Sequence, residues 1–271
     1  MTDWLRKLQQ LEIEQLCVFA EICDKYNLRY YLVGGTLLGA VRHKGFIPWD
    51  DDIDVAMPRV DYNRFLDIAP HELPKDLELE NPVQIPKDPY YVTRLRRRNT
   101  VYESGYIRQF ELPCTGVWID VFPLDDQPRQ ESFLQRIDGY LIERHLNRII
   151  RNYYNAGPIT AGGGAYLWLA RCLPFAFYRK ARDRIARRHE GKNLAYWLTY
   201  AGIFGYRKET FAKSVFEPPA QLEFEGRLYT APGDYHQWLL RMYGDYMQLP
   251  PPEKRVPHKA VRFLIDGVSQ R

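Results

Sequence analysis

The stretch WDDDIDV, residues 49–55, carries four carboxylates within five positions and then alternates polar and apolar side chains. This alternation predicts a half-buried strand, because successive residues of a strand point to opposite faces. Asp52 and Asp54 are then expected on one face, with their Cα atoms ~6.6 Å apart, and Ile53 and Val55 in the core. Two carboxylates ~4 Å apart repel by about 4 kcal/mol at an effective dielectric constant of about 20. We therefore expect a cation beside them, and hard carboxylate oxygens suit Mg²⁺ or Mn²⁺.

The acidic stretch also allows two simpler structures. It can be a solvated acidic turn after Pro48, as most acidic runs are. An EF-hand loop fits less well, because Val55 stands where that loop requires glycine and Pro58 falls on a ligand position.

The residues before the acidic stretch predict a strand, a glycine break and a short helix. Residues 29–33 are aromatic and β-branched, Gly34 and Gly35 follow, and a helix is expected from Thr36 to Arg42. Glycines let the backbone approach an anion, and a helix N-terminus supplies N–H donors. The sequence is neither a Walker loop nor a dinucleotide-binding fingerprint. Strand, Gly-Gly, helix and an Asp-x-Asp strand together indicate a nucleotidyltransferase-type site that binds a phosphate-bearing ligand at Gly34, Gly35 and Thr36.

A third carboxylate is expected from Asp120, which lies inside the apolar run GVWIDVFP, residues 116–123. A lone aspartate within a strand is either a costly buried charge or a ligand. We favour the ligand. Asp125 and Asp126 follow Pro123 and Leu124, and we expect them in a turn or helix cap.

The rest of the chain predicts an α+β protein in three parts: a core over 1–126, a helical region over 127–220, and a hairpin and tail over 221–271 that close on the core as one unit. The elements expected are helices over 4–26, 61–68, 130–153, 165–190 and 234–243, strands over 77–80, 91–96 and 117–122, and a hairpin at 225–226.

Composition narrows the class of protein. The chain has 271 residues, 14% aromatic side chains and a net charge of +4, which excludes a disordered chain and does not predict nucleic-acid binding. No signal peptide or membrane span is expected. The cysteines show no zinc-ligand spacing, and we expect reduced thiols in the cytoplasm (Cys17, Cys23, Cys114 and Cys172).

At this point the sequence resembles the LicD family of phosphotransferases. The run TLLGAVRHKGFIPWDDDID, residues 36–54, looks like the family's first motif, and IDVFPLD, residues 119–125, matches its second. YGDYM, residues 243–247, followed by His258, is similar to the C-terminal motif. Residues 127–220 carry no motif of the family.

The resemblance implies a nucleotidyltransferase-like fold with a mixed sheet, flanking helices and a helical insertion. It also implies an enzyme that transfers a phospho-alcohol, typically phosphocholine from CDP-choline, onto a sugar hydroxyl of teichoic acid or lipopolysaccharide. Related proteins of the fukutin-related type transfer ribitol phosphate. By position, Asp52 and Asp54 correspond to the metal ligands and Asp120 to the third carboxylate, which acts as a ligand or base.

Five further residues are candidates for holding the donor. Arg42, His43 and Lys44 follow the short helix and can clamp phosphate, or they form a solvated basic turn. Trp49 can stack on the base, and His258 can close over the donor. Arg94 and Arg96 share a strand face and can line an anionic cleft, although plain surface charge is the simpler expectation.

The basic segment 179–188 follows an aromatic stretch. We expect residues 165–188 to contact the inner face of a membrane where a lipid-linked acceptor resides. A solvated helix face is the simpler alternative.

Two alternatives to the transferase stay open. One is a nucleotidyltransferase that moves a nucleoside monophosphate from a nucleoside triphosphate. The other is a non-enzymatic cation-binding protein at a membrane surface.

Overall fold

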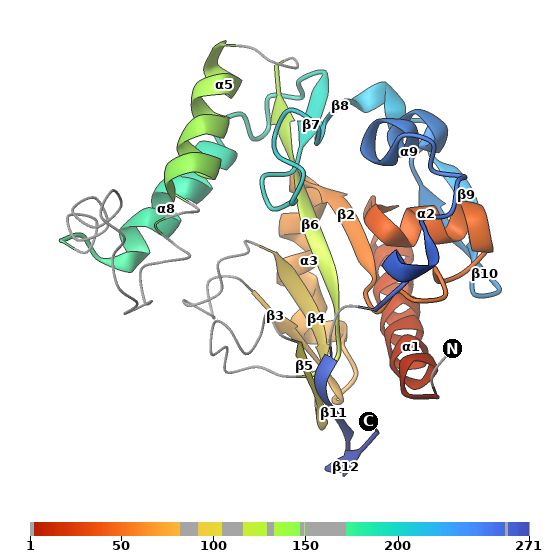
Figure 1. Ribbon diagram of the computed structural model, residues 1–271. Helices are drawn as coiled ribbons and strands as arrows, with labels where there is room; N and C mark the ends of the chain where they lie inside the picture. The colour runs from red at the N-terminus through yellow and green to blue at the C-terminus, as the bar shows by residue number, and fades with distance from the viewer. Residues whose placement is uncertain are drawn as a thin grey trace, which may run out of the picture.

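The computed structural model describes residues 3–81, 92–104, 116–128, 133–146, 149, 172–257 and 260–270. Its centre is a seven-stranded mixed sheet (Figure 1). The spatial order along its main path is β1 (Tyr31–Leu32), β2 (Asp54–Pro58), β6 (Trp118–Gln127), β4 (Thr93–Arg97) and β3 (Leu77–Glu80). β7 (Tyr196–Leu198) extends the sheet by pairing with the end of β6, and β8 (Thr210–Ala212) pairs with β7. β2 and β6 run parallel, and the other pairs are antiparallel, so the predicted mixed α+β fold is confirmed.

Three helices pack against the central sheet. They are α1 (Asp3–Tyr26), α2 (Gly34–His43) and α3 (Arg59–Glu72). α1 buries Leu8, Leu16 and Phe19 completely, as its apolar spacing predicts. The Phe19 ring meets that of Phe65 of α3 edge-to-face, with centroids 5.0 Å apart. The same core holds Ile53 and Val55, so β2 is anchored by the residues that alternate with its aspartates.

Different elements lie on the two sides of the central sheet in Figure 1. On one side lie α2, α9 (Tyr235–Tyr243) and the hairpin of β9 (Ala220–Phe224) and β10 (Arg227–Ala231); on the other lie α5 (Phe133–Gly139) and α8 (Phe175–Ala186). α5 continues directly into a π-helix, η1 (Tyr140–Leu146). A small sheet of β5 (Thr100–Ser104), β11 (Ala260–Ile265) and β12 (Val268–Ser269) lies near the C-terminus, and short 3₁₀ turns occupy η2 (Lys213–Val215) and η3 (Pro252–Lys254).

The predicted hairpin at residues 225–226 and the helix over 234–243 are confirmed. Glu225 and Gly226 both have positive φ, 49° and 81°, which the tight turn requires. Glu225 also fixes the hairpin to the core, because its backbone N–H donates to the carbonyl of Lys44 and its carboxylate accepts the N–H of Phe46. Asp234 caps α9 by accepting the N–H of Gln237.

The prediction of a turn at Asp125 and Asp126 was wrong. β6 runs on to Gln127, and both aspartates lie in it. Asp125 is buried, and Arg59 at the start of α3 forms two bonds to its carboxylate, 2.7 and 3.0 Å long. The strand tolerates the charge because a distant arginine neutralises it.

The basic segment 179–188 does not present all its charges to solvent. Arg179 and Arg182 are buried, and Arg182 donates to the carbonyl of Tyr200. Arg187 pairs with Asp183 and Glu190, and Arg188 with Asp138. The membrane face expected at 165–188 is therefore weaker than its composition suggests, and residues 165–171 lie outside the described part.

Three of the four cysteines fall in the described part, and all three are free thiols, namely Cys17, Cys23 and Cys172. Cys114 lies outside it. Within the described residues, no helix combines the length and the apolar character needed to cross a bilayer. The division into parts at 126 and 220 stays a prediction.

Candidate functional site

The acidic residues meet Asp120 at the centre of the sheet. In the parallel pair β2–β6, Asp54 lies directly opposite Asp120. The N–H of Asp120 donates to the carbonyl of Ile53 over 2.9 Å, which fixes this register. Asp52 lies just before β2, and all three aspartates line one cavity of about 690 Å³. The predicted grouping of Asp52, Asp54 and Asp120 is therefore present.

The first turn of α2 closes one side of this cavity. Gly34 and Gly35 both line it, and α2 begins at Gly34 rather than at Thr36. A Cβ on Gly34, which has φ +60°, would collide with Oδ2 of Asp54, and one on Gly35 would come within 2.5 Å of Oδ2 of Asp50. Glycine is thus required so that two carboxylates can stand against the electropositive end of the helix.

Thr36 acts one step behind the cavity. Its side chain is buried, and its Oγ1 accepts the backbone N–H of Asp54 over 2.8 Å. The hydroxyl does not face the cavity but holds the start of β2 in place. Gly34 and Thr36 therefore both act on Asp54, Gly35 makes room for Asp50, and the direct role in ligand binding predicted for these three residues stays a prediction.

The neighbouring carboxylates raise the pKa of Asp54 and of Glu12. Burial raises the pKa of Asp54 well above its ordinary value, and the charges of Asp52 and Asp120 raise it further. Glu12 of α1 is buried beneath the same group, and its pKa is raised by burial and then by Asp52. The sequence signal for Glu12 was available, because it takes a position of the apolar face of α1, four residues after Leu8.

Asp51 has a different role from its neighbours. Its Oδ2 accepts the hydroxyl of Tyr102, 2.5 Å away, in a buried contact. Burial and this carboxylate raise the pKa of Tyr102, so the phenol stays protonated as the donor. The pair ties the acidic loop to β5.

Arg94 brings positive charge to the cavity. It lies opposite Asp120 in the β4–β6 pair, and its Nε is 3.3 Å from Oδ1 of Asp120. Glu80 binds the same guanidinium at 3.2 Å and Arg96 at 2.7 Å. Arg94 and Arg96 are both buried, so the expectation of surface charge was wrong; of the two, Arg94 lines the cavity.

The far wall of the cavity comes from the segment between β7 and β8 and from α9. Glu209 is buried there, its Oε1 accepts the N–H of Phe204 over 2.9 Å, and burial raises its pKa to about 7. Tyr243 lies on the same wall, and its pKa is raised by burial and then by Asp54. Nothing in the local sequence pattern distinguishes Glu209, because its burial depends on the long-range β7–β8 pairing.

Four other candidates lie elsewhere. Arg42, His43 and Lys44 end α2, away from the cavity lining. Arg42 donates to the carbonyl of Tyr246 and to His43, and Lys44 is 3.3 Å from Glu223. Trp49 packs against the core beneath the Arg255 guanidinium. His258 lies outside the described residues.

The carboxylates of the cavity have the oxygen ligands that a divalent cation prefers. Among the described residues, no three or more His, Cys, Asp or Glu side chains stand arranged as a ready-made metal site. Asp120 is ion-paired with Arg94. Mg²⁺ commonly takes only one or two carboxylates and completes its shell with water and substrate phosphate. Asp52 and Asp54 fit that kind of site, with the remaining ligands left to the substrate.

Comparison with known proteins places this site in a family. Residues 27–131 match the family described as "LicD/FKTN/FKRP, nucleotidyltransferase domain". Over 258 residues, the chain is 30% identical to the lipopolysaccharide cholinephosphotransferase LicD of Haemophilus influenzae, which covers 94% of this chain and 95% of that protein. The chain belongs to the LicD family. It is therefore a transferase.

Other relatives match over shorter stretches. The ribitol 5-phosphate transferase FKRP of Homo sapiens is 47% identical over 36 residues, 13% of this chain and 7% of FKRP. An uncharacterized protein of Rickettsia typhi is 48% identical over 50 residues, 18% of this chain and 16% of its own. In this LicD protein the first motif forms α2 and the start of β2, and the C-terminal motif supplies Tyr243 to the cavity.

Proposed function

We propose that the protein transfers phosphocholine from CDP-choline onto a hydroxyl group of a cell-surface glycoconjugate, such as teichoic acid or lipopolysaccharide, with the help of Mg²⁺ or Mn²⁺. The observation that carries the proposal is the register of Asp54 against Asp120 beside Asp52. It occurs in a chain that aligns with a cholinephosphotransferase over 94% of its length. The choice of phosphocholine rests on that relative, and a different alcohol would use the same site.

The reaction breaks a phosphoanhydride bond of the donor and forms a phosphodiester bond to the acceptor. The acceptor hydroxyl loses its proton, its oxygen bonds to the phosphorus that carries choline, and the bond from that phosphorus to CMP breaks. A divalent cation at Asp52 and Asp54 would supply charge neutralisation at the phosphate oxygens. In this proposal Asp120 takes the proton, which is supported by the partial exposure of its side chain on the cavity wall next to Asp54.

The protein also supplies positive charge of its own for the leaving CMP. Arg94 lies at the cavity wall with its guanidinium beside Asp120. The first turn of α2 adds the positive end of a helix dipole at Gly34 and Gly35. Glu80 holds Arg94 in a fixed orientation, so its charge is already in place before the substrate arrives.

A donor panel tests the proposal. CDP-choline, CDP-ethanolamine, CDP-glycerol and CDP-ribitol are each incubated with the protein, Mg²⁺ and purified lipopolysaccharide or teichoic acid, and CMP release is measured. In a parallel reaction CTP replaces the CDP-alcohol, and pyrophosphate release is measured. We expect CMP from CDP-choline and label transfer to the glycoconjugate. Pyrophosphate from CTP without CMP from any donor would favour a nucleotidyltransferase. No product from any donor would favour the cation-binding protein.

A further inference from the structure

The helical segment formed by α5 and η1 buries Ile142 in a small apolar cluster, but it also turns polar side chains inward and leaves large apolar ones exposed. Gln135 and Asp138 are buried, each 1% exposed, and face the protein. Gln135 donates to Oγ1 of Thr210 over 2.7 Å, and Asp138 pairs with Arg188 at 3.0 Å. The outer face instead carries large apolar side chains (Phe133 76%, Ile137 38%, Tyr140 56% and Leu141 37% exposed). A surface helix of a soluble protein normally turns its apolar face inward.

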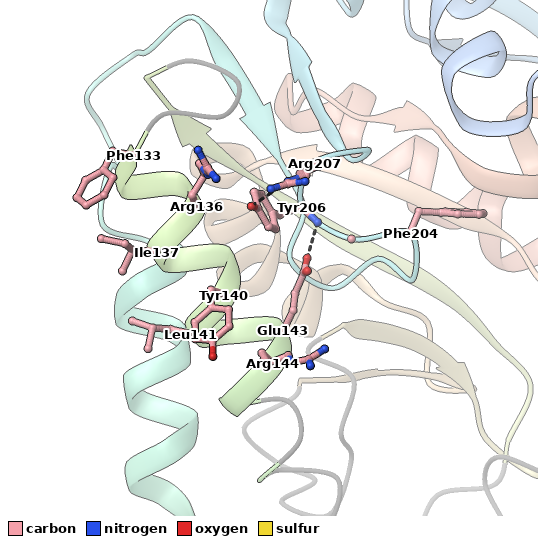
Figure 2. A pocket seen from close by; sticks show the side chains of 11 residues that line it. Phe133, Arg136, Ile137, Tyr140, Leu141, Glu143, Arg144, Phe204, Tyr206 and Arg207 are labelled. Atoms are coloured by element: carbon pink, nitrogen blue, oxygen red, sulfur yellow. Dashed lines mark hydrogen bonds between the residues drawn. The ribbon is translucent and has the colours of Figure 1, made fainter.

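The exposed apolar residues have cations around them and few exposed carboxylates. They line a hollow of about 850 Å³ together with Arg136, Arg144 and Arg207 (Figure 2). The lining also holds one acidic residue, Glu143, whose carboxylate accepts the backbone N–H of Tyr206 (Figure 2). Because Asp138 is buried, the lining carries three arginines against one glutamate, so the outer face is apolar with a net positive charge.

The hollow adjoins the catalytic cavity. Phe204 lines both, and it belongs to the segment between β7 and β8 that also carries Glu209. Ile203, beside it, is 77% exposed. The apolar surface therefore continues from α5 to the edge of the cavity.

We propose that this surface, the docking face, rests on an anionic lipid bilayer. We define it as the exposed apolar residues Phe133, Ile137, Tyr140, Leu141, Ile203 and Phe204 with the arginines Arg136, Arg144 and Arg207. Aromatic and aliphatic side chains enter the interfacial region, and the arginines meet lipid phosphates. Binding does not depend on the proposed reaction; only its purpose, access to a lipid-linked acceptor, rests on that reaction.

Vesicle binding tests the docking face on the full-length protein. Phosphatidylcholine vesicles with and without phosphatidylglycerol are mixed with the protein, and bound protein is measured by flotation. We expect binding to the anionic vesicles at low salt and its loss at several hundred millimolar salt, since the Debye length falls to about 3 Å at 1 M. Vesicles of phosphatidylcholine alone should bind at least about tenfold more weakly.

Two double variants separate the apolar and the cationic contributions. Phe133→Ser with Tyr140→Ser, and Arg136→Gln with Arg144→Gln, should each weaken binding about tenfold. These side chains are exposed, so both proteins should keep the wild-type melting temperature. Leu228→Ser, 62% exposed on β10, is the apolar control, and Lys180→Gln with Arg184→Gln on α8 is the cationic control. Both controls should bind as the wild type does.

Three results would overturn the proposal. The wild type does not bind anionic vesicles at low salt, or the docking-face variants bind as well as the wild type, or the α8 control loses binding instead. If light scattering shows a dimer that Phe133→Ser with Tyr140→Ser dissociates, and vesicles do not bind, the face is an interface between two copies. CMP release is measured separately, so vesicle binding without turnover would reject the proposed function and leave the docking face standing.

Discussion

Asp54 and Asp120 lie directly opposite each other on the parallel strands β2 and β6. Side chains in register on adjacent strands emerge on the same face, about 4.8 Å apart along the hydrogen-bonding direction. The two carboxylates therefore share one small volume at the cavity wall, with Arg94 beside Asp120 and the first turn of α2 beside Asp54. This arrangement keeps negative charge concentrated where a cation and a phosphate would meet.

The space beside Asp54 depends on a glycine. We predict that Gly34→Ala lowers turnover by about 100-fold, because the new Cβ collides with Oδ2 of Asp54. The change also places a side chain at φ +60°, which costs about 1–2 kcal/mol of stability. Gly226→Ala is the control, since Gly226 has φ +81° and no atom within 4 Å of its Cβ position. Equal turnover in the two variants would show that only backbone strain matters.

Breaking the buried pair of Arg59 and Asp125 is predicted to destabilise the fold. Removing one partner, as in Arg59→Met, leaves the other charge buried and should lower the free energy of unfolding by about 3–5 kcal/mol. Arg59→Met combined with Asp125→Leu should recover much of that loss, because no charge then remains buried. Urea denaturation of the two single variants and the double variant measures this. A double variant less stable than both single variants would contradict the account.

Glu209 predicts a pH dependence of stability. Burial raises the pKa of Glu209 to about 7 in the folded protein, above the ordinary value of about 4.3 in the unfolded chain. The folded state therefore holds its proton more tightly, and the stability due to this group is complete below about pH 4 and is lost as pH rises to about 7. In metal-free buffer, Glu209→Gln should remove roughly 3–4 kcal/mol of that decline. Parallel stability curves for the two proteins would refute the prediction.

The cation requirement is predicted to affect turnover and not the fold. Treatment with EDTA should abolish CMP release, and Mg²⁺ or Mn²⁺ should restore it, because only Asp52, Asp54 and substrate are needed to hold the ion. The far-ultraviolet circular dichroism spectrum should stay unchanged.

Zinc should be absent from the purified protein by elemental analysis, and a stoichiometric zinc needed for folding would contradict this.

The elements nearest the acidic motif were predictable from the sequence because their signals are local. Alternation placed Ile53 and Val55 in the core, and the apolar spacing of α1 gave its length. The predictions that were wrong concern residues whose partners lie far away in the sequence. The sequence around Asp125 favours a turn, because its partner, Arg59, lies 66 residues away and gives no local signal. β7, β8 and β5 carried no usable pattern, so Glu209 was missed as well.

The basic segment 179–188 also shows that the local sequence does not reveal which charges are paired within the fold. Six cations in residues 179–188 indicated a membrane face, yet four of them are buried or ion-paired with the protein. The outward apolar face of α5 could not be distinguished from an ordinary amphipathic helix, because periodicity identifies a stripe without telling which side is covered.

Turnover by Asp54→Asn tests the central claim most directly. We predict that CMP release from CDP-choline falls at least about 100-fold in this variant. Its melting temperature without metal should stay at or above that of the wild type, since removing one carboxylate relieves repulsion from Asp52 and Asp120. Asp67→Asn, on the exposed side of α3, is the matched control and should be fully active. A folded Asp54→Asn protein with wild-type CMP release would show that the site formed by Asp52, Asp54 and Asp120 does not catalyse the reaction.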